Sequence, residues 1–168
     1  MTETFRSLTP KFTALGAVLA LLAAALYGWH LWTAPPAEVL LPHADCDLNT
    51  GACTQTLPTG ATVRFTIGPQ PIPVMEDLDL NADFTGETPD RVMVDLNGTT
   101  MKMAANQPQL LPVGNNRFEG KTALSVCITG AMQWQATLQV DYGRTRYLLP
   151  FIFDSAHSND AGDSPPLE

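Results

Sequence analysis

The sequence predicts a mainly β protein, an immunoglobulin-like antiparallel β-sandwich behind a single N-terminal transmembrane helix. Two observations carry this prediction. One uninterrupted apolar run, Phe12 to Trp32, lies near the start of the chain. Beyond it, apolar and polar residues alternate with a period of two between glycine-containing turns, which is typical of antiparallel sheets that bury one face.

The apolar run has the composition of a membrane span. It contains no Asp, Glu, Lys or Arg, and at ~1.5 Å per residue it is long enough to cross a hydrocarbon core of ~30 Å. Tyr27, Trp29 and Trp32 stand at its end, where aromatic rings suit the level of the lipid headgroups. A cleaved signal peptide has a shorter apolar stretch and a small-residue exit, so residues 12–32 favour a retained anchor.

Basic residues around this run predict its orientation. Arg6 and Lys11 precede it, whereas the first basic residue after it is Arg64. Basic flanks stay in the cytoplasm. We therefore expect a single-pass protein of the bacterial inner membrane, with residues 1–11 as a cytoplasmic tail and the C-terminal domain in the periplasm.

Two segments without apolar periodicity are expected to flank one folded domain. Residues 33–45 contain three prolines and form a predicted linker. Residues 154–168 are polar and form a predicted disordered tail. The interval 46–153 is long enough for one hydrophobic core, which gives a single periplasmic β-sandwich domain.

Several extended segments are expected within this domain. In one of them Val63, Phe65 and Ile67 share a face, and the longest alternation includes Trp134. Turn signals such as Asn97-Gly98 and Gly114-Asn115-Asn116 separate the segments. An immunoglobulin-like topology is the first choice and a small barrel the second. The predicted strands are residues 61–67, 78–84, 92–96, 109–112, 117–124, 133–142 and 146–153.

The charge balance argues against one class of partner. The chain has 9 basic and 17 acidic residues, a net charge of -8. Such a chain is repelled by phosphate backbones, and its sequence contains no cluster of Lys and Arg. Nucleic-acid binding is therefore not expected.

Three cysteines have to be explained. Cys46 and Cys53 enclose a turn-like segment, and in an oxidising compartment two such cysteines are natural disulfide partners. The alternative is a redox-active dithiol, although the spacing is not that of a Cys-x-x-Cys motif. Cys127 is then left over, and an odd cysteine in an exported domain is notable.

Groups for conventional catalysis are scarce in the predicted domain. The histidines are His30 in the apolar run, His43 in the linker and His157 in the tail. A Ser-His-Asp or Cys-His arrangement within residues 46–153 would thus have no imidazole base. We do not expect an enzyme.

A group of sulfur-bearing residues is the main candidate site. Met101 and Met103 lie two residues apart, and Cys127 and Met132 flank a short turn-like segment. Soft thioether and thiolate ligands select Cu(I), so these residues are the candidate Cu(I) ligands and Cu(I) the candidate cofactor. The alternative is packing, because methionine commonly fills gaps in cores and free cysteine is often buried.

Residues 92–138 carry a resemblance to known proteins. An Asp-ended strand is followed by a Met-bearing loop, a Gly-marked strand and a Cys, Gly, Trp segment, in the order Asp95, Met101, Met103, Phe118, Gly120, Cys127, Gly130 and Trp134. This layout resembles the YtkA-like and FixH-like families of small bacterial membrane-anchored proteins, and Val126 stands where those families carry proline. The resemblance implies an immunoglobulin-like domain outside the cytoplasmic membrane, with a link to copper supply and cytochrome oxidase assembly.

Three functions remain open from the sequence. The leading hypothesis is a non-enzymatic periplasmic accessory protein that handles Cu(I) or helps assemble a copper-dependent respiratory oxidase. Its rival is a metal-free module that binds a protein partner in the membrane or periplasm. The third, a thiol oxidoreductase, would require an accessible Cys127 thiol of low pKa.

Overall fold

The computed structural model describes residues 9–125 and 132–155, and it divides the chain into two units, Met1–Pro35 and Pro36–Glu168. In the described part of the first unit, residues form the helix α1 (Thr9–Thr33). Its stretch Leu15–Thr33 is long and apolar enough to cross a membrane. The helix therefore includes the predicted span, and it begins three residues before it.

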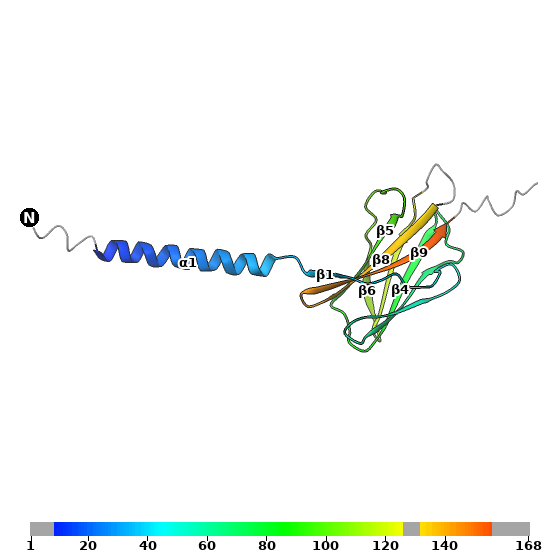
Figure 1. The fold of residues 1–168 in the computed structure, drawn as a ribbon, viewed down its shortest axis with the longest axis horizontal. Coiled ribbons are helices and arrows are strands. Elements are labelled where there is room, and N and C mark those ends of the chain that lie inside the picture. Colours follow the sequence, from blue (N-terminus) through cyan, green and yellow to red (C-terminus); the bar gives the residue numbers. More distant parts are fainter. Residues whose placement is uncertain (1–8, 126–131, 156–168) are drawn as a thin grey trace, which may run out of the picture. The chain divides into compact units, whose positions relative to one another are not determined.

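The second unit is built from strands, which confirms the mainly β fold class behind an N-terminal apolar helix (Figure 1). All seven predicted strands are present, with ends shifted by up to a few residues. Two short strands, β1 and β2, were not predicted. The strands are β1 (Ala37–Leu40), β2 (Cys53–Thr56), β3 (Thr62–Gly68), β4 (Asp77–Thr85), β5 (Arg91–Gly98), β6 (Gln109–Gly114), β7 (Arg117–Ala123), β8 (Met132–Tyr142) and β9 (Thr145–Ser155).

The strands form one curled sheet of nine, in the order β1-β9-β8-β5-β6-β7-β4-β3-β2. Strand β6 joins its two halves: Gln109 and Leu110 pair with β5, whereas Leu111 to Gly114 pair with β7. We call the strands before β6 in this order the β9 half and those after it the β3 half. Figure 1 shows β8 running between β5 and β9 in the first of these.

One edge of the sheet departs from the expected antiparallel arrangement. Strand β1 pairs in parallel with β9, so a wholly antiparallel domain is a wrong prediction, and the segment expected as a linker contains a strand. The reason is backbone pairing: the amide of Ala37 donates to Arg144 at 2.8 Å and that of Leu41 to Leu148 at 2.9 Å. The sandwich arrangement and the immunoglobulin-like topology stay predictions.

The core lies between the two halves of the curled sheet. On β3, Val63, Phe65 and Ile67 are buried, as the alternation predicts. Phe65 meets Phe151 of β9, with the two ring centroids 5.4 Å apart. Because these rings come from opposite halves, their contact shows that the sheet curls until its apolar faces pack against each other.

The predicted turns have mixed outcomes. Asn115 and Asn116 have φ of 51° and 56° between β6 and β7, the left-handed conformation that tight hairpins require. Asn97-Gly98, by contrast, is not a turn: both residues belong to β5, and Gly98 pairs with Trp134. At the C-terminus β9 continues two residues past the predicted boundary at 153, and residues 156–168 lie outside the described part of the chain.

Candidate functional site

At the end of β5, Gly98 lies close to the side chain of Met132 and to the backbone of Met101. A Cβ atom built at Gly98 would lie 2.6 Å from the carbonyl oxygen of Met101, 2.7 Å from Cε of Met132 and 3.5 Å from its sulfur. The Met132 side chain and the backbone of Met101 therefore both contact this glycine. The structure thus brings the loop carrying Met101 next to the first residue of β8.

Hydrogen bonds hold the loop of residues 99–103 in this place. The amide of Thr99 donates to the Gln133 carbonyl at 3.1 Å. The Asn97 side chain accepts from the amide of Met103 at 2.9 Å. Asn97 thus acts as an anchor for the far end of the loop, a role that the sequence does not reveal because the asparagine looks like part of a turn.

The sulfur-bearing residues differ in their surroundings. Met101 is 42% exposed and Met132 only 7% exposed, while Met103 is partly buried against the core. Cys127 lies outside the described residues. Three candidate Cu(I) ligands hence occur on two adjoining segments, and residues 9–125 and 132–155 contain no cluster of three His, Cys, Asp or Glu side chains that could hold a metal.

Two buried polar atoms lie on the strands that follow this loop. Nε1 of Trp134 on β8 and Oγ of Ser155 on β9 have no hydrogen-bond partner in the part of the chain that the structure describes. Ser155 is opposite Met132 in the register, and Trp134 is two residues further along the same face. The end of β8 that carries the Met132 thioether thus lies beside two polar groups without a partner among the described residues.

Gly98→Ala is expected to lower the free energy of unfolding by about 1–2 kcal/mol, the lower part of the range for overfilling a packed space. The added methyl group would collide with the Met101 carbonyl and the end of Met132. Urea denaturation of the full chain measures the effect. Gly68→Ala, at a position with nothing within 4 Å, is the control, and equal losses in both variants would refute tight packing at Gly98.

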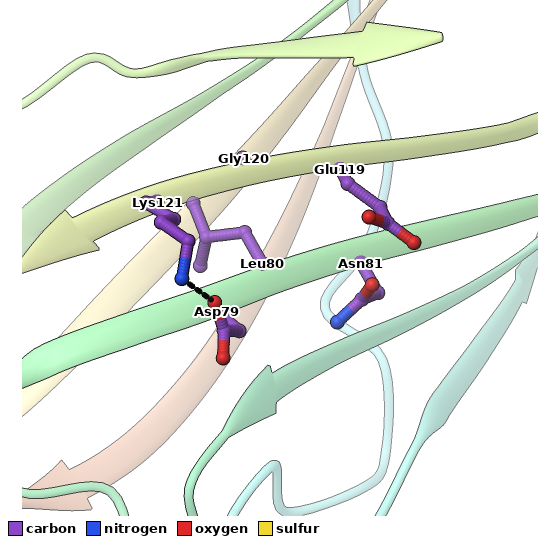
Figure 2. Close-up of a pocket in the computed structure, with 6 residues that line it drawn as sticks. All are labelled: Asp79, Leu80, Asn81, Glu119, Gly120 and Lys121. Atoms are coloured by element: carbon purple, nitrogen blue, oxygen red, sulfur yellow. Dashed lines mark hydrogen bonds and ion pairs between the residues drawn. The ribbon is translucent and has the colours of Figure 1, made fainter. Parts of the chain in front are cut away.

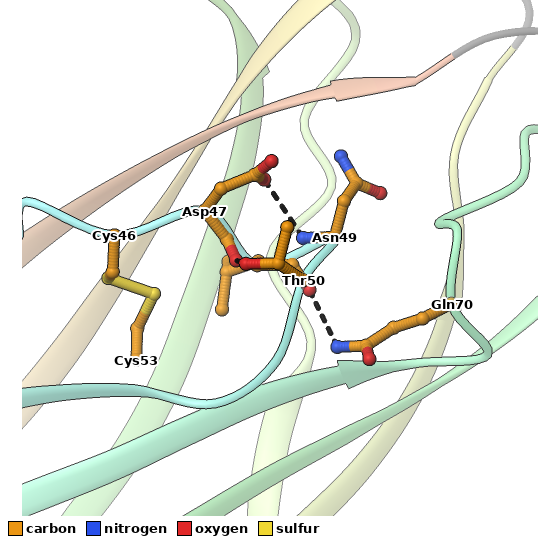
Figure 3. Close-up of a disulfide and its surroundings, with 7 residues drawn as sticks. Cys46, Asp47, Asn49, Thr50, Cys53 and Gln70 are labelled. Carbon is orange, nitrogen blue, oxygen red and sulfur yellow. Dashed lines mark hydrogen bonds between the residues drawn. A yellow bond between two sulfur atoms is a disulfide. The ribbon is translucent and has the colours of Figure 1, made fainter.

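The predicted disulfide between Cys46 and Cys53 is present, with their Cα atoms 5.8 Å apart (Figure 3). Inside the loop that it closes, the Asn49 side chain donates to the carbonyl of Asp154 at 2.7 Å and accepts from the amide of Ile72 at 2.9 Å. The carbonyl of Leu48 accepts from Gln70 at 2.6 Å. The disulfide loop thus connects the end of β9 to the segment between β3 and β4, which is a structural role.

A shallow pocket of about 440 Å³ lies over β4 and β7 (Figure 2). Lys121 and Asp79 form an ion pair at 2.7 Å across it, and this partner raises the pKa of Lys121. Glu119 is bound by Arg117 at 3.1 Å. Each charged side chain that lines this pocket is thus ion-paired. It is lined by Asp79, Leu80, Asn81, Glu119, Gly120 and Lys121.

The sequence did not point to these pocket residues or to Asn49. Asp79, Asn81, Glu119 and Lys121 look like the ordinary polar face of two strands, and only the β4–β7 register places them opposite each other. Asn49 looks like a turn residue, yet its side chain reaches a carbonyl 105 residues away. No local pattern could have found contacts of this range.

Burial at the β8–β9 hairpin raises the pKa of Tyr142 to about 12, with further contributions from Glu87 and Tyr147. Its hydroxyl donates to the Glu87 carbonyl at 3.0 Å. The pKa of the nearby Arg146 is also raised, chiefly by its hydrogen bond to Asp141. The protonated Tyr142 phenol is thus favoured in the folded state.

Stability is expected to fall as the pH rises from about 10, the ordinary tyrosine pKa, to about 12. A folded-state pKa above the unfolded one means that the contribution of Tyr142 is fully present below pH ~10 and is lost above it. Unfolding of the full chain at successive pH values measures this loss. Tyr142→Phe should show a shallower decline, and identical slopes would contradict the assignment.

No family model, curated protein or solved structure matches this chain. The resemblance of residues 92–138 to the YtkA-like and FixH-like families therefore stays a prediction from the sequence. The function has to be inferred from the residues of the chain itself.

Proposed function

We propose that this chain is a non-enzymatic accessory protein of the bacterial inner membrane, with its N-terminus in the cytoplasm and its β domain in the periplasm. The apolar helix α1 supports a membrane anchor. The Cys46–Cys53 disulfide supports an oxidising compartment for the β domain. The negative net charge makes a protein, rather than a nucleic acid, the natural macromolecular partner.

The activity that we propose for this domain is the handling of Cu(I) for the assembly of a copper-dependent respiratory oxidase. Met101, Met103, Cys127 and Met132 are its proposed ligands, because thioethers and a thiolate suit a soft cation. The observation that carries the proposal is the meeting of Met132 and the Met101 backbone at Gly98. When bound there, Cu(I) would supply an exchangeable metal, and the loop of residues 99–103 would position two of its donors.

Titration of the full chain in detergent with Cu(I), against a chromophoric competitor, tests this proposal. We expect binding tighter than about 1 µM that is lost when all four residues are replaced together, methionines by Leu and Cys127 by Ser. Met75→Leu is the matched control, since Met75 is an exposed methionine in the segment between β3 and β4. Cu(I) binding that is no tighter than micromolar, or that is unchanged when the four residues are replaced, would refute the copper function.

The second candidate is a metal-free module that binds a protein partner. It is favoured by Leu111 and Val113 of β6, which are 61% and 54% exposed although both are apolar. Exposed apolar groups next to one another are typical of contact surfaces. In this hypothesis the methionine side chains serve only as packing groups, as Met132 and Met103 do against the core.

Assembly of the respiratory oxidase in cells that carry variant chains separates the two candidates. The interaction module predicts that Met101→Leu with Met103→Leu preserves assembly, whereas Leu111→Asp with Val113→Asp abolishes it. Cu(I) handling predicts the opposite pattern. Normal levels of each variant in the membrane are the required control.

A further inference from the structure

The solvent-facing side of β5 carries two opposite charges placed symmetrically about a methionine. Val92, Val94 and Leu96 are buried in the core, so the alternation of the strand turns Arg91, Met93 and Asp95 to the other face. Arg91 and Asp95 are each two residues from Met93. Reversing the direction of the strand would therefore exchange the positions of the two charges.

Asp95, on the same face, has one carboxylate oxygen that no donor among the described residues satisfies. Within residues 9–125 and 132–155, this buried Oδ1 has no hydrogen-bond partner, although the residue is partly exposed on the outer face opposite Thr137 of β8. Leaving a buried charged acceptor unpaired is costly. A cation placed over this partly exposed carboxylate would offset its charge.

Arg91 is a donor without an ion-pair partner among the described residues. Its neighbour in the register is Asp141, but the carboxylate of Asp141 pairs with Arg146, at 2.7 and 2.9 Å. Arg91 is exposed at the end of the strand. The exposed guanidinium is therefore available to a second molecule.

Partly apolar side chains continue the row of Met93 across the β9 half. Met93 pairs with Gln139, Gln139 with Leu148, and Leu148 with Leu40. Leu40 is 70% exposed, and Met93 and Leu148 are partly buried on the same face. In a second copy placed over it, the same row would meet its own residues one by one.

We propose that this face binds a second copy of the chain, with a twofold axis along the Met93 row. Two antiparallel β5 strands then stack face to face, and Arg91 of each copy donates to Asp95 of the partner subunit. Met93 meets the same residue of the partner. Twofold interfaces are self-complementary in this way, each contact occurring twice, and the symmetric spacing about Met93 is what favours a second copy over an unrelated partner.

Charge exchange tests the pairing in the full chain reconstituted in detergent micelles. Arg91→Asp alone and Asp95→Arg alone each place like charges together, so each should weaken dimerisation at least about tenfold, or ~1.4 kcal/mol. The double variant restores opposite charges and should return to within about threefold of the wild-type dissociation constant. The dissociation constant is measured by fluorescence energy transfer between donor-labelled and acceptor-labelled chains as the chains are diluted with micelles.

Cross-linking provides a second measurement that does not depend on the charge variants folding. In a Cys127→Ser background, Met93→Cys should form an intermolecular disulfide under mild oxidation, because the axis places this position next to itself. Leu111→Cys, at a more exposed position on the part of β6 that pairs with β7, should not. A chain that stays monomeric at all concentrations, a double variant as weak as the single ones, or equal cross-linking at 93 and 111 would overturn the proposal.

Discussion

Replacing Phe65 by alanine is expected to lower the free energy of unfolding by about 3–5 kcal/mol, the cost of deleting a buried phenylalanine. Phe65 is fully buried on β3 and contacts Phe151 of β9. The loss combines the apolar surface of the ring, the cavity left behind and an aromatic contact worth about 0.5–1.5 kcal/mol. The two halves of the curled sheet would be held together less tightly.

Urea denaturation of the full chain in detergent, followed by the fluorescence of the buried Trp134, measures this effect. Leu111→Ala is the control, since this exposed side chain should change stability by no more than about 0.5 kcal/mol. Phe151→Ala should cost about as much as Phe65→Ala, and the double variant less than their sum, because contacting residues are coupled. A loss below ~1 kcal/mol for Phe65→Ala, or full additivity, would contradict a shared core contact.

Removing the disulfide by Cys46→Ser with Cys53→Ser is expected to cost about 2.5 kcal/mol, the loop-entropy value for so short a closure. The two cysteines are seven positions apart, and the loop between them holds Leu48 and Asn49 against the rest of the domain. Without the bond, the unfolded chain gains freedom that the folded chain does not. The native contacts of Asn49 would then have to order the loop alone.

Chemical denaturation again provides the measurement. Reduction of the wild-type chain with a dithiol should reproduce the loss, while Cys127→Ser in oxidised protein should leave the effect of the disulfide intact. The double serine variant should not respond to the dithiol. Stability unchanged by the serine variants would mean that the disulfide is dispensable for the fold.

Much of the β domain could be predicted from local patterns. Period-two alternation predicts β3, β4 and β8 because each buries one face and exposes the other to water, as in Val63, Phe65 and Ile67. Asn115 and Asn116 predict a hairpin because few residues tolerate positive φ. The apolar run predicts the helix because nothing charged interrupts it.

Features that depend on distant residues were beyond such patterns. Every residue of β1 is exposed, so no alternation of apolar and polar residues predicts this strand. It forms because its backbone pairs with the edge of β9. The hydrogen bond from the Met103 amide to the Asn97 side chain likewise depends on the folded structure. So does the register that places Arg91 beside Asp141, which pairs with Arg146. The candidate methionines could be named from the sequence, but their meeting place at Gly98 depends on how β5 pairs with β8.

The parallel pairing of β1 with β9 also determines when the domain can be completed. Among the described residues, β1 is the first strand and β9 the last, so β1 lacks its partner until synthesis reaches Thr145. During synthesis, the edges of β1 and β8 stay open, and open strand edges invite pairing with other chains. A chain that ends before β9 would keep both edges unpaired. The sheet of this domain can therefore be completed only after β9 has been synthesised.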